Sequence, residues 1–307
     1  MPLDPYVVDL LAKARSLGRP PLRRLTPAEA RAFVDADTAA KPRGPDLFAV
    51  EAVEVPGPAG PLRLRIYRPA AGVRPAVLYL HGGGFVFCDL DSHDGICRLL
   101  AARSGRTVVA VDYRLAPEHP FPAAADDGLA VLRLMAERAD AFAIDPARIV
   151  VAGDSAGGNL AAVTALRARD EGGPPIEGQI LAYPVTASYD AGFESYRIFA
   201  EGFGLTASDM VWFWDHYADA RGRAHPHAAP FLATSLAGLP PAFVFTAEYD
   251  VLRDEGEAYA RRLLEAGVLT RFERVRALHH GFLHLVDHPP AAAVFDAMAD
   301  WLAGLER

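Results

Sequence analysis

Five short, continuously apolar runs, each of strand length, place the strongest constraint on the fold of this chain. They occupy residues 76–80, 107–111, 149–152, 180–183 and 242–246. A strand that is apolar along its whole length is covered by helices on both faces. Helix-length segments at 92–103, 123–138 and 157–169 lie between the runs. This alternation predicts an α/β fold with a mostly parallel central sheet and right-handed crossovers.

Residues 62–68 differ from these runs because apolar and polar side chains alternate there one by one. A period of two is typical of a strand with one solvent-exposed face. We therefore expect an antiparallel strand near an edge of the sheet.

Two helices are predicted before any strand. Asp4 is placed to cap the first helix. Thr26, Pro27 and Glu29 supply a capping hydroxyl, a first-turn proline and a capping-box carboxylate for the second. Helices in this position are more typical of a lid than of the start of a sheet.

The stretch 186–240 interrupts the strand–helix alternation, since it is rich in aromatic residues and contains no buried-strand run. We interpret it as an insertion in the fold. The expected organisation is a helical cap in two pieces, residues 1–45 and 186–240, and an α/β core in two parts, residues 46–185 and 241–307.

Composition excludes several classes of protein. The 307 residues carry 31 Lys and Arg against 39 Asp and Glu, and the net charge of −8 argues against a nucleic-acid-binding or anionic-membrane-binding surface. Hydrophobic residues make up 51% of the chain, enough for a full globular core. Cys88 and Cys97 are too few for a disulfide scaffold and lack metal-ligand spacing. We expect a globular protein with no bound metal.

No segment predicts export or membrane insertion. Asp4 and Asp9 interrupt the apolar residues near the start, so residues 1–20 do not resemble a signal peptide. The longest apolar runs are far shorter than the roughly 18 residues of a transmembrane helix. We expect a cytoplasmic protein without a membrane span.

The strongest single motif is GDSAG at residues 153–157, which follows an apolar run and opens a helical pattern. A strand–turn–helix of this kind holds a serine in strained backbone geometry and exposes its hydroxyl at a helix N-terminus. Side chains at Gly153 and Gly157 would collide with the neighbouring strand and helix. The motif predicts Ser155 as a nucleophile. A structural glycine turn is the alternative, because five-residue matches also occur by chance.

A second motif, HGGGF at residues 81–85, offers successive amides without side chains. Attack of a serine on a carbonyl creates an alkoxide, and each fixed donor to it is worth about 3 kcal/mol in comparable enzymes. We expect His81 and Gly82 to support this loop. A phosphate-binding loop is the alternative, but the chain has neither a G-x-G-x-x-G pattern nor a P-loop lysine. The predicted oxyanion hole consists of the amides of Gly83, Gly84 and Ala156.

A nucleophilic serine needs a general base. His280 follows the strand-like run 270–275 and precedes a glycine. Its neighbour His279 is a competitor, and adjacent residues of an extended loop point to opposite sides, so only one of the two rings is expected to face Ser155.

The base in turn needs an orienting carboxylate. Asp250 lies just beyond the run at 242–246, at the carboxyl edge of a predicted strand, where α/β proteins collect their ligands. Asp254 is the rival, although its surroundings are more typical of the start of the next helix. We favour Asp250. The order Ser155, Asp250, His280 along the chain is that of α/β-hydrolases.

Taken together, the motifs resemble those of the bacterial hormone-sensitive-lipase family of carboxylesterases. The resemblance rests on HGGGF at 81–85, DYRLAPEH at 112–119, GDSAGGNL at 153–160, DVLRDEG at 250–256 and HGF at 280–282. It implies an α/β-hydrolase core with a helical cap, no cofactor, and hydrolysis of short to medium acyl esters. It also supports His280 over His279, because the catalytic histidine of the family directly precedes Gly-Phe.

The aromatic residues near these motifs are the candidates for substrate contact. Phe85 stands where family members often carry tryptophan, and we expect it to shape the acyl pocket. Trp212, Phe213 and Trp214 cannot all lie on one helix face; Trp214 is a further pocket candidate, although packing inside the cap is the interpretation we favour. The segment 113–119 is expected to brace the oxyanion loop, with Arg and Glu side chains available for a buried pair.

The sequence predicts a carboxylesterase acting on a small-molecule ester, with a homodimer as an option for its assembly. An amidase using the same three residues is one alternative. A non-catalytic receptor, as in the plant gibberellin receptors that the family resembles, is another. Such receptors typically lose the catalytic histidine, which this chain retains at His280.

Overall fold

A computed structural model of the chain describes residues 1–39 and 43–305. One eight-stranded sheet forms its centre, in the order β1-β2-β4-β3-β5-β6-β7-β8. The strands are β1 (Ala49–Gly57), β2 (Gly60–Arg68), β3 (Arg74–Leu80), β4 (Thr107–Val111), β5 (Ile144–Asp154), β6 (Gly178–Ala182), β7 (Ala242–Tyr249) and β8 (Thr270–His279). Neighbours from β4 to β8 run parallel, which confirms the predicted α/β fold with a mostly parallel sheet.

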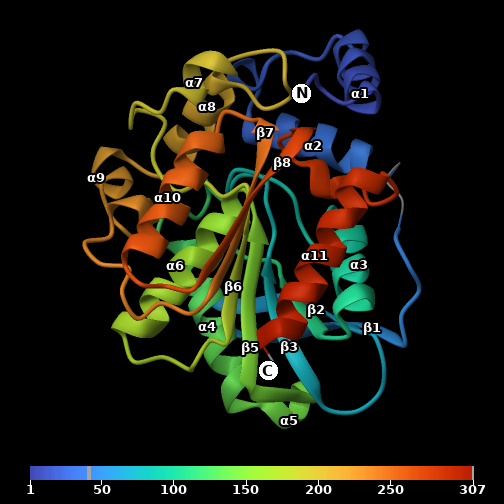
Figure 1. The fold of residues 1–307 in the computed structure, drawn as a ribbon, viewed down its shortest axis with the longest axis vertical. Coiled ribbons are helices and arrows are strands. Elements are labelled where there is room, and N and C mark those ends of the chain that lie inside the picture. Colours follow the sequence, from blue (N-terminus) through green and yellow to red (C-terminus); the bar gives the residue numbers. More distant parts are fainter. Residues whose placement is uncertain (40–42, 306–307) are drawn as a thin grey trace.

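Helices cover both faces of this sheet (Figure 1). The α-helices are α1 (Pro5–Ser16), α2 (Pro27–Thr38), α3 (Asp94–Ser104), α4 (Ala123–Glu137), α5 (Ala139–Phe142), α6 (Ala156–Asp170), α7 (Ser195–Ile198), α8 (Ala207–Tyr217), α9 (Ala220–Arg223), α10 (Arg253–Glu265) and α11 (Pro289–Leu305). Three short 3-10 helices complete the set: η1 (Leu22–Arg24), η2 (Pro230–Leu232) and η3 (Phe282–His284). Within the described parts of the chain, no helix is both long and apolar enough to cross a membrane.

The apolar core has two layers, one on each face of the sheet. Along β3, Leu78 and Leu80 point into the layer shared with α4, α6 and α10. Val77 and Tyr79 point into the layer shared with α3 and α11. All four side chains are buried, which explains why the run reads as continuously apolar.

The antiparallel edge of the sheet contains one strand more than the sequence predicts. β2 pairs antiparallel with β4 and lies next to the outermost strand, which confirms the predicted antiparallel strand near an edge. β1 forms a hairpin with it and takes the edge. The sequence of β1 does not stand out because its side chains are only half-buried or exposed, so no apolar run marks it.

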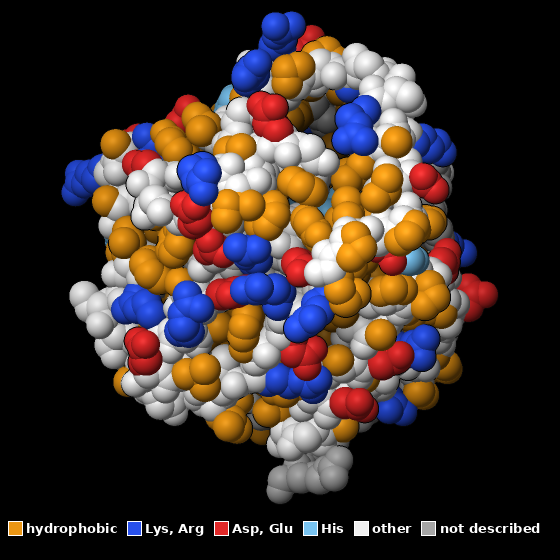
Figure 2. All heavy atoms as spheres, turned by 45° about the horizontal axis from the view of Figure 1, so that its top comes forward, with side chains coloured by type: hydrophobic (Ala, Val, Ile, Leu, Met, Phe, Trp, Pro, Cys, Tyr) orange, Lys and Arg blue, Asp and Glu red, His pale blue; other side chains and the backbone are white. Residues whose placement is uncertain are grey.

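The helices outside the core gather at one end of the sheet, where α1, α2, α7 and α8 lie together (Figure 1). The first two begin where their capping residues predict. Asp4 Oδ1 accepts a hydrogen bond from the amide of Tyr6 at 2.8 Å. Thr26 and Glu29 form a reciprocal capping box at the start of α2. The face that bears these helices also carries many hydrophobic side chains (Figure 2).

Candidate active site

Ser155 stands in the turn between β5 and α6 with φ 55° and ψ −118°, a conformation that L-residues seldom adopt. Hydrogen bonds to the neighbouring segment hold it there. Its amide donates to the carbonyl oxygen of Ala182 at 2.8 Å, and its own carbonyl accepts from the amide of Val185 at 3.1 Å. The side chain is 8% exposed. The end of β6 thus keeps the serine in its strained position.

Steric contacts explain why the turn has glycine at positions 153 and 157. A Cβ at Gly157 would lie 1.9 Å from the carbonyl oxygen of Leu80, and a Cβ at Gly153 would lie 2.3 Å from that of Gly157. These neighbours are backbone atoms of packed elements, which cannot move aside as a side-chain end can. β3 therefore approaches the start of α6 as closely as it does only because glycine is present.

A continuous hydrogen-bond chain joins Ser155 to two residues from other strand ends. His280 Nε2 lies 3.0 Å from Ser155 Oγ. His280 Nδ1 lies 2.7 Å from Asp250 Oδ2. Asp250 follows β7 and is 1% exposed, and its Oδ1 accepts from the amide of Leu252 at 2.9 Å. With Nδ1 donating to the carboxylate, Nε2 is left to accept the serine hydrogen.

The two rival residues lie outside this chain of hydrogen bonds. The ring of His279 packs beside Gly204 in the cap, and burial lowers its pKa to about 4, with His280 acting in the same direction. Asp254 accepts from the amide of Ser195 at 2.8 Å and pairs with Arg253. Asp254 therefore fastens α7 to α10.

The HGGGF loop follows β3 and lies beside the serine. Gly83 has φ 108° and Gly84 has φ 59°, backbone conformations that favour glycine. The carbonyl of Gly83 accepts from the amides of Val86 and Phe87, both at 3.1 Å, which turns the loop back on itself. Both glycines line the same cavity as Ser155. Ala156 is the first residue of α6, so its amide is one that no intrahelical carbonyl accepts.

His81 and Gly82 are the first two residues of this loop and make buried contacts with neighbouring segments. His81 Nδ1 donates to the carbonyl of Gly82 at 2.7 Å, and its ring stacks on Tyr113 at 4.1 Å between centroids. Tyr113 Oη donates to the carbonyl of His81 at 2.8 Å. Burial lowers the pKa of His81 to about 4, and the nearby His93 acts in the same direction. A neutral, buried His81 therefore ties two strand ends together.

Asp154, which precedes the serine, is a residue whose role the sequence does not reveal. Its Oδ1 accepts from Tyr79 Oη at 2.8 Å and from the amide of Gly82 at 3.1 Å. Burial opposes its ionisation, but the nearby His93 ring and the hydrogen bond from Tyr79 outweigh burial and hold the pKa of Asp154 well below its ordinary value. The carboxylate fastens the glycine loop to the end of β5.

The segment 113–119 pairs differently from the expectation. Arg114 makes its ion pair with Asp127 of α4. Glu118 is instead held by Arg31 of α2 in a two-point contact with distances of 2.8 and 2.7 Å. Arg31 also donates to the carbonyl of Val86 at 2.8 Å and to that of Ala116 at 2.9 Å. One arginine of α2 thus contacts both the residue that follows the HGGGF loop and the segment 113–119.

A cavity of about 170 Å³ opens between Ser155, His280 and the cap. Its apolar lining consists of Phe87, Cys88, Val185, Leu205, Met210 and Phe213. Phe213 of α8 packs directly on the glycine loop, since a Cβ at Gly84 would lie 2.1 Å from its ring. The cavity therefore has one polar wall, which includes Ser155 and His280, and one apolar wall supplied partly by residues 186–240.

The two expected pocket residues, Phe85 and Trp214, are not among the residues that line the cavity. Phe85 is 1% exposed and stacks on Tyr217 at 3.7 Å between ring centroids. Trp214 is fully buried beside the same two rings, as the packing interpretation holds. Both lie behind the cavity lining. Phe85 has a positive φ and its side chain is buried in the core. On α8, the residue that lines the cavity is Phe213.

Known proteins share this architecture. The chain matches a family model described as the alpha/beta hydrolase fold over residues 77–284. It is 45% identical over 262 residues to the esterase LipI of Mycobacterium tuberculosis, covering 83% of this chain and 81% of LipI. It is 41% identical over 233 residues to the ethyl acetate hydrolase of Pseudomonas putida, covering 73% and 72% of the two chains. The solved structure of the hyperthermophilic esterase from Pyrobaculum calidifontis matches with a TM-score of 0.93 at 38% identity, covering 100% of this chain and 99% of that one.

The family match spans well over half of the chain, and full-length structural agreement accompanies it. The sequence motifs and the strand order are consistent with the same assignment. This chain belongs to the hormone-sensitive-lipase family of carboxylesterases, which have the α/β-hydrolase fold.

Proposed function

We propose that this carboxylesterase hydrolyses short to medium acyl esters with Ser155 as nucleophile, His280 as general base and acid, and Asp250 as the carboxylate that orients His280. The hydrogen-bond chain from Ser155 Oγ through the His280 ring to Asp250 Oδ2, at 3.0 and 2.7 Å, carries the proposal. A serine is activated when its hydroxyl points at one nitrogen of an imidazole ring and a buried carboxylate holds the other nitrogen of that ring.

In the acylation step, Ser155 Oγ attacks the ester carbonyl carbon while His280 Nε2 takes the hydroxyl proton. The carbonyl oxygen becomes an alkoxide, which the amides of Gly83, Gly84 and Ala156 receive as hydrogen-bond donors. His280 then gives its proton to the departing alcohol oxygen as the carbon–oxygen bond breaks. Asp250 stabilises the imidazolium that exists between these two transfers.

In the deacylation step, a water molecule takes the place of the alcohol. His280 removes a proton from this water, which attacks the carbonyl carbon of the acyl-enzyme, and the same amides receive the oxygen. The proton returns to Ser155 Oγ when the acid leaves. The enzyme is thereby restored without any cofactor taking part.

The cavity size supports the substrate class. A volume of about 170 Å³ beside Ser155 accommodates a short acyl chain, and Phe213 and Phe87 close its apolar side. We further propose that residues 1–45 and 186–240 act as a cap over the core parts 46–185 and 241–307. The cap supplies Leu205, Met210 and Phe213, so it contributes to acyl-chain selection.

Hydrolysis of p-nitrophenyl esters from acetate to palmitate tests the proposal. We expect turnover to peak at short or medium chains. Ser155→Ala should lose about a thousandfold or more in kcat while keeping the same far-ultraviolet circular dichroism and melting temperature. Undiminished hydrolysis by the folded variant would exclude Ser155 as the nucleophile.

The same assay separates the two alternatives. A matched p-nitroanilide series reports amidase activity, which we expect to be far slower because an amine leaving group demands more of the acid. A folded protein that turns over neither series, yet binds an ester analogue, would favour the receptor interpretation. The retained His280, in contact with Ser155, supports an enzyme over a receptor.

Two matched variants test whether residues 186–240 influence the preferred acyl-chain length. Phe213→Ala removes a ring from the cavity wall, so we expect the preferred ester to lengthen. Trp214→Ala removes a buried ring behind the wall, so we expect lower stability with the same preferred ester. The reverse pattern of chain-length profiles would contradict this assignment of the pocket wall.

A further inference from the structure

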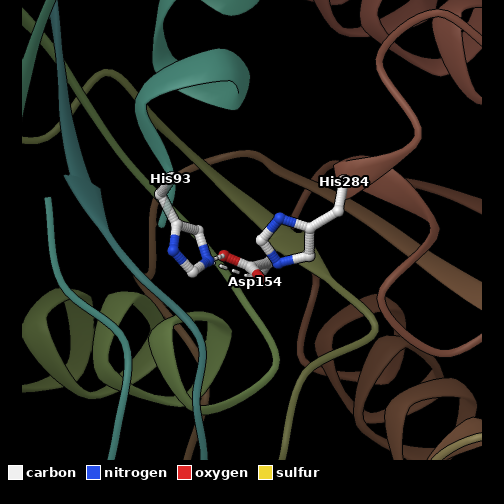
Figure 3. A group of neighbouring side chains, drawn as sticks. All are labelled: His93, Asp154 and His284. Atoms are coloured by element: carbon white, nitrogen blue, oxygen red, sulfur yellow. Dashed lines mark hydrogen bonds and ion pairs between the residues drawn. The ribbon is translucent and has the colours of Figure 1, made fainter. Parts of the chain in front are cut away.

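Three side chains behind the nucleophile converge on one point. His93 precedes α3, Asp154 ends β5 and His284 ends η3. One possible ligand atom from each residue lies within 4.8 Å of those of the other two. The two rings approach the carboxylate from opposite sides (Figure 3). His93 and Asp154 are buried. The proposed ester chemistry requires neither ring.

The hydrogen bonds around His93 leave its Nε2 as an acceptor. Ser92 Oγ gives its one hydrogen to the carbonyl of Asp89 at 2.8 Å, so the contact of 3.0 Å between Ser92 Oγ and His93 Nδ1 has the ring as donor. His93 Nε2 then accepts from the amide of Gly82 at 3.2 Å. The lone pair on Nε2 is the one that a metal ligand needs, and this nitrogen lies on the side of the ring that faces Asp154.

One donor serves two acceptors at this point. The amide of Gly82 also donates to Asp154 Oδ1 at 3.1 Å, and His93 Nε2 lies 3.2 Å from the same oxygen. Both acceptor atoms thus share a single hydrogen. A cation between them would bind both atoms at once. The 3.2 Å separation is close to the roughly 3.3 Å between ligand atoms of a tetrahedral site with bonds of about 2.0–2.1 Å.

The third group, His284, connects the cluster to the surface. It lines both the small cavity of Ser155 and a separate polar cavity of about 760 Å³. Carboxylates of Asp35, Asp89, Asp91 and Asp94 line the polar cavity, together with Arg43, Arg65 and Arg98. A hydrated cation therefore has a polar route from solvent to His284.

We propose that His93, Asp154 and His284 form a binding site for a divalent transition cation of the zinc type, and that occupancy of this site inhibits ester hydrolysis. Two imidazole nitrogens and one carboxylate oxygen are ligands that zinc accepts, with a fourth position left for water. Asp154 and His284 both line the cavity of Ser155, so this fourth position faces the substrate.

The inhibitory effect follows from what the cation withdraws. Asp154 Oδ1 and His93 Nε2 are the two acceptors of the Gly82 amide, and Gly82 precedes the proposed oxyanion donors. A cation that takes both acceptors leaves this amide without its partners and loosens the loop. This step rests on the proposed function, whereas binding of the cation does not.

Isothermal titration of ZnCl₂ into the Ser155→Ala protein tests binding independently of activity. We expect one zinc ion per chain. Adding His284→Gln should weaken binding by at least about tenfold, since it removes one ligand. Adding His119→Gln, an exposed histidine, should change nothing. Equal binding by the His284→Gln protein would overturn the site and place the ion elsewhere, for example at His280.

A second measurement does not require the His284→Gln variant to fold. Co²⁺ added to the Ser155→Ala protein should give the intense visible absorption of a four- or five-coordinate site and be displaced by Zn²⁺. Only the weak absorption of octahedral Co²⁺, in a protein of unchanged melting temperature, would overturn the proposal.

The inhibition arm uses the unsubstituted enzyme and p-nitrophenyl acetate. We expect Zn²⁺ to lower kcat, EDTA to restore it, and His284→Gln to raise the half-inhibitory zinc concentration at least about tenfold. Zinc binding at His284 without loss of activity would overturn the inhibitory step. A protein that binds zinc there but hydrolyses no ester would instead overturn the proposed function and leave the cation site standing.

Discussion

The turn at residues 153–157 and the helix α2 are held in place by different physical interactions. All five residues of the turn at 153–157 are buried, and close backbone contacts fix the strained Ser155. In α2, by contrast, Ala30 is the single buried side chain among its described residues, and polar ties attach the helix to the core. A region fixed by steric contacts tolerates almost no change, whereas a region attached by hydrogen bonds and ion pairs can be loosened in degrees.

The steric side of this comparison predicts the largest effect. Gly157→Ala places a Cβ 1.9 Å from the carbonyl oxygen of Leu80. Overpacking a core costs about 1–3 kcal/mol when side chains can adjust. Here the neighbour is backbone, so we expect a loss of more than about 3 kcal/mol, a large share of the roughly 5–15 kcal/mol that stabilises a domain. Chemical denaturation measures this loss.

Gly304→Ala is the matched control. Gly304 also lies in a helix, α11, and a Cβ there would meet nothing within 4 Å. Both substitutions gain the same helix propensity of up to about 1 kcal/mol, so the difference between them isolates the contact with β3. We expect Gly304→Ala to be neutral or stabilising. Equal stability of the two variants would show that β3 and α6 can separate without cost.

The same contrast explains what the sequence reveals. The GDSAG and HGGGF motifs are local, because a strained turn and a glycine loop need particular residues at adjacent positions. Apolar runs likewise predict buried strands. β1 has no such run, so the sequence does not predict it. Ser155, Asp250 and His280 converge because the carboxyl ends of parallel strands meet at one edge of the sheet.

Long-range polar contacts carry no comparable signal. Arg31 and Glu118 are 87 residues apart, and nothing in either neighbourhood indicates the other. The convergence of His93 with Asp154 and His284 is equally invisible, since their spacing matches no local metal motif. The choice between Phe213 and Trp214 depends on the rotation of α8, which a run of adjacent aromatic residues does not specify.

Glu255 attaches the start of the insertion and combines both kinds of constraint. It is fully buried in α10 and accepts from the amides of Thr186 at 2.7 Å and Ala187 at 3.2 Å. Burial raises its pKa to about 8, and these hydrogen bonds only partly oppose that rise. The folded protein therefore holds a proton on Glu255 at pH values where the unfolded chain has lost it.

The sign of the pH effect follows directly. A raised pKa in the folded state gives stability that is complete below the ordinary value of 4.5 and is lost as the pH rises toward about 8. Glu255→Gln keeps an acceptor for both amides but cannot ionise. We expect the stability of the unsubstituted protein, measured relative to this variant by urea denaturation, to fall by about 2 kcal/mol between pH 6 and pH 8. Parallel stability curves for the two proteins would contradict a protonated Glu255.

The smallest predicted effect concerns the polar attachment of α2, and it is graded. Arg31 donates to the carbonyl of Val86 beside the oxyanion loop and pairs with Glu118 of the bracing segment. Oxyanion donors act in the transition state, so loosening their support lowers kcat and leaves KM nearly unchanged. We expect Arg31→Gln to reduce kcat about tenfold, equivalent to about 1.4 kcal/mol. Steady-state kinetics with p-nitrophenyl esters measures both constants.

Arg19→Gln supplies the comparison, because Arg19 makes an equally well-formed two-point pair with Asp37, at 2.6 and 2.7 Å, and both partners lie in the N-terminal segment. An exposed pair of this kind contributes about 0–1 kcal/mol to stability and has no route to the oxyanion loop. We expect kcat within about twofold of the unsubstituted enzyme, the range that such a small energy allows. If both variants lowered kcat equally, a general weakening of the cap would explain the loss. If only Arg31→Gln lowered kcat, with an unchanged melting temperature, α2 would affect catalysis through the positioning residue Arg31. The hydrogen-bonded helix α2 would then contribute to catalysis together with the buried turn at 153–157.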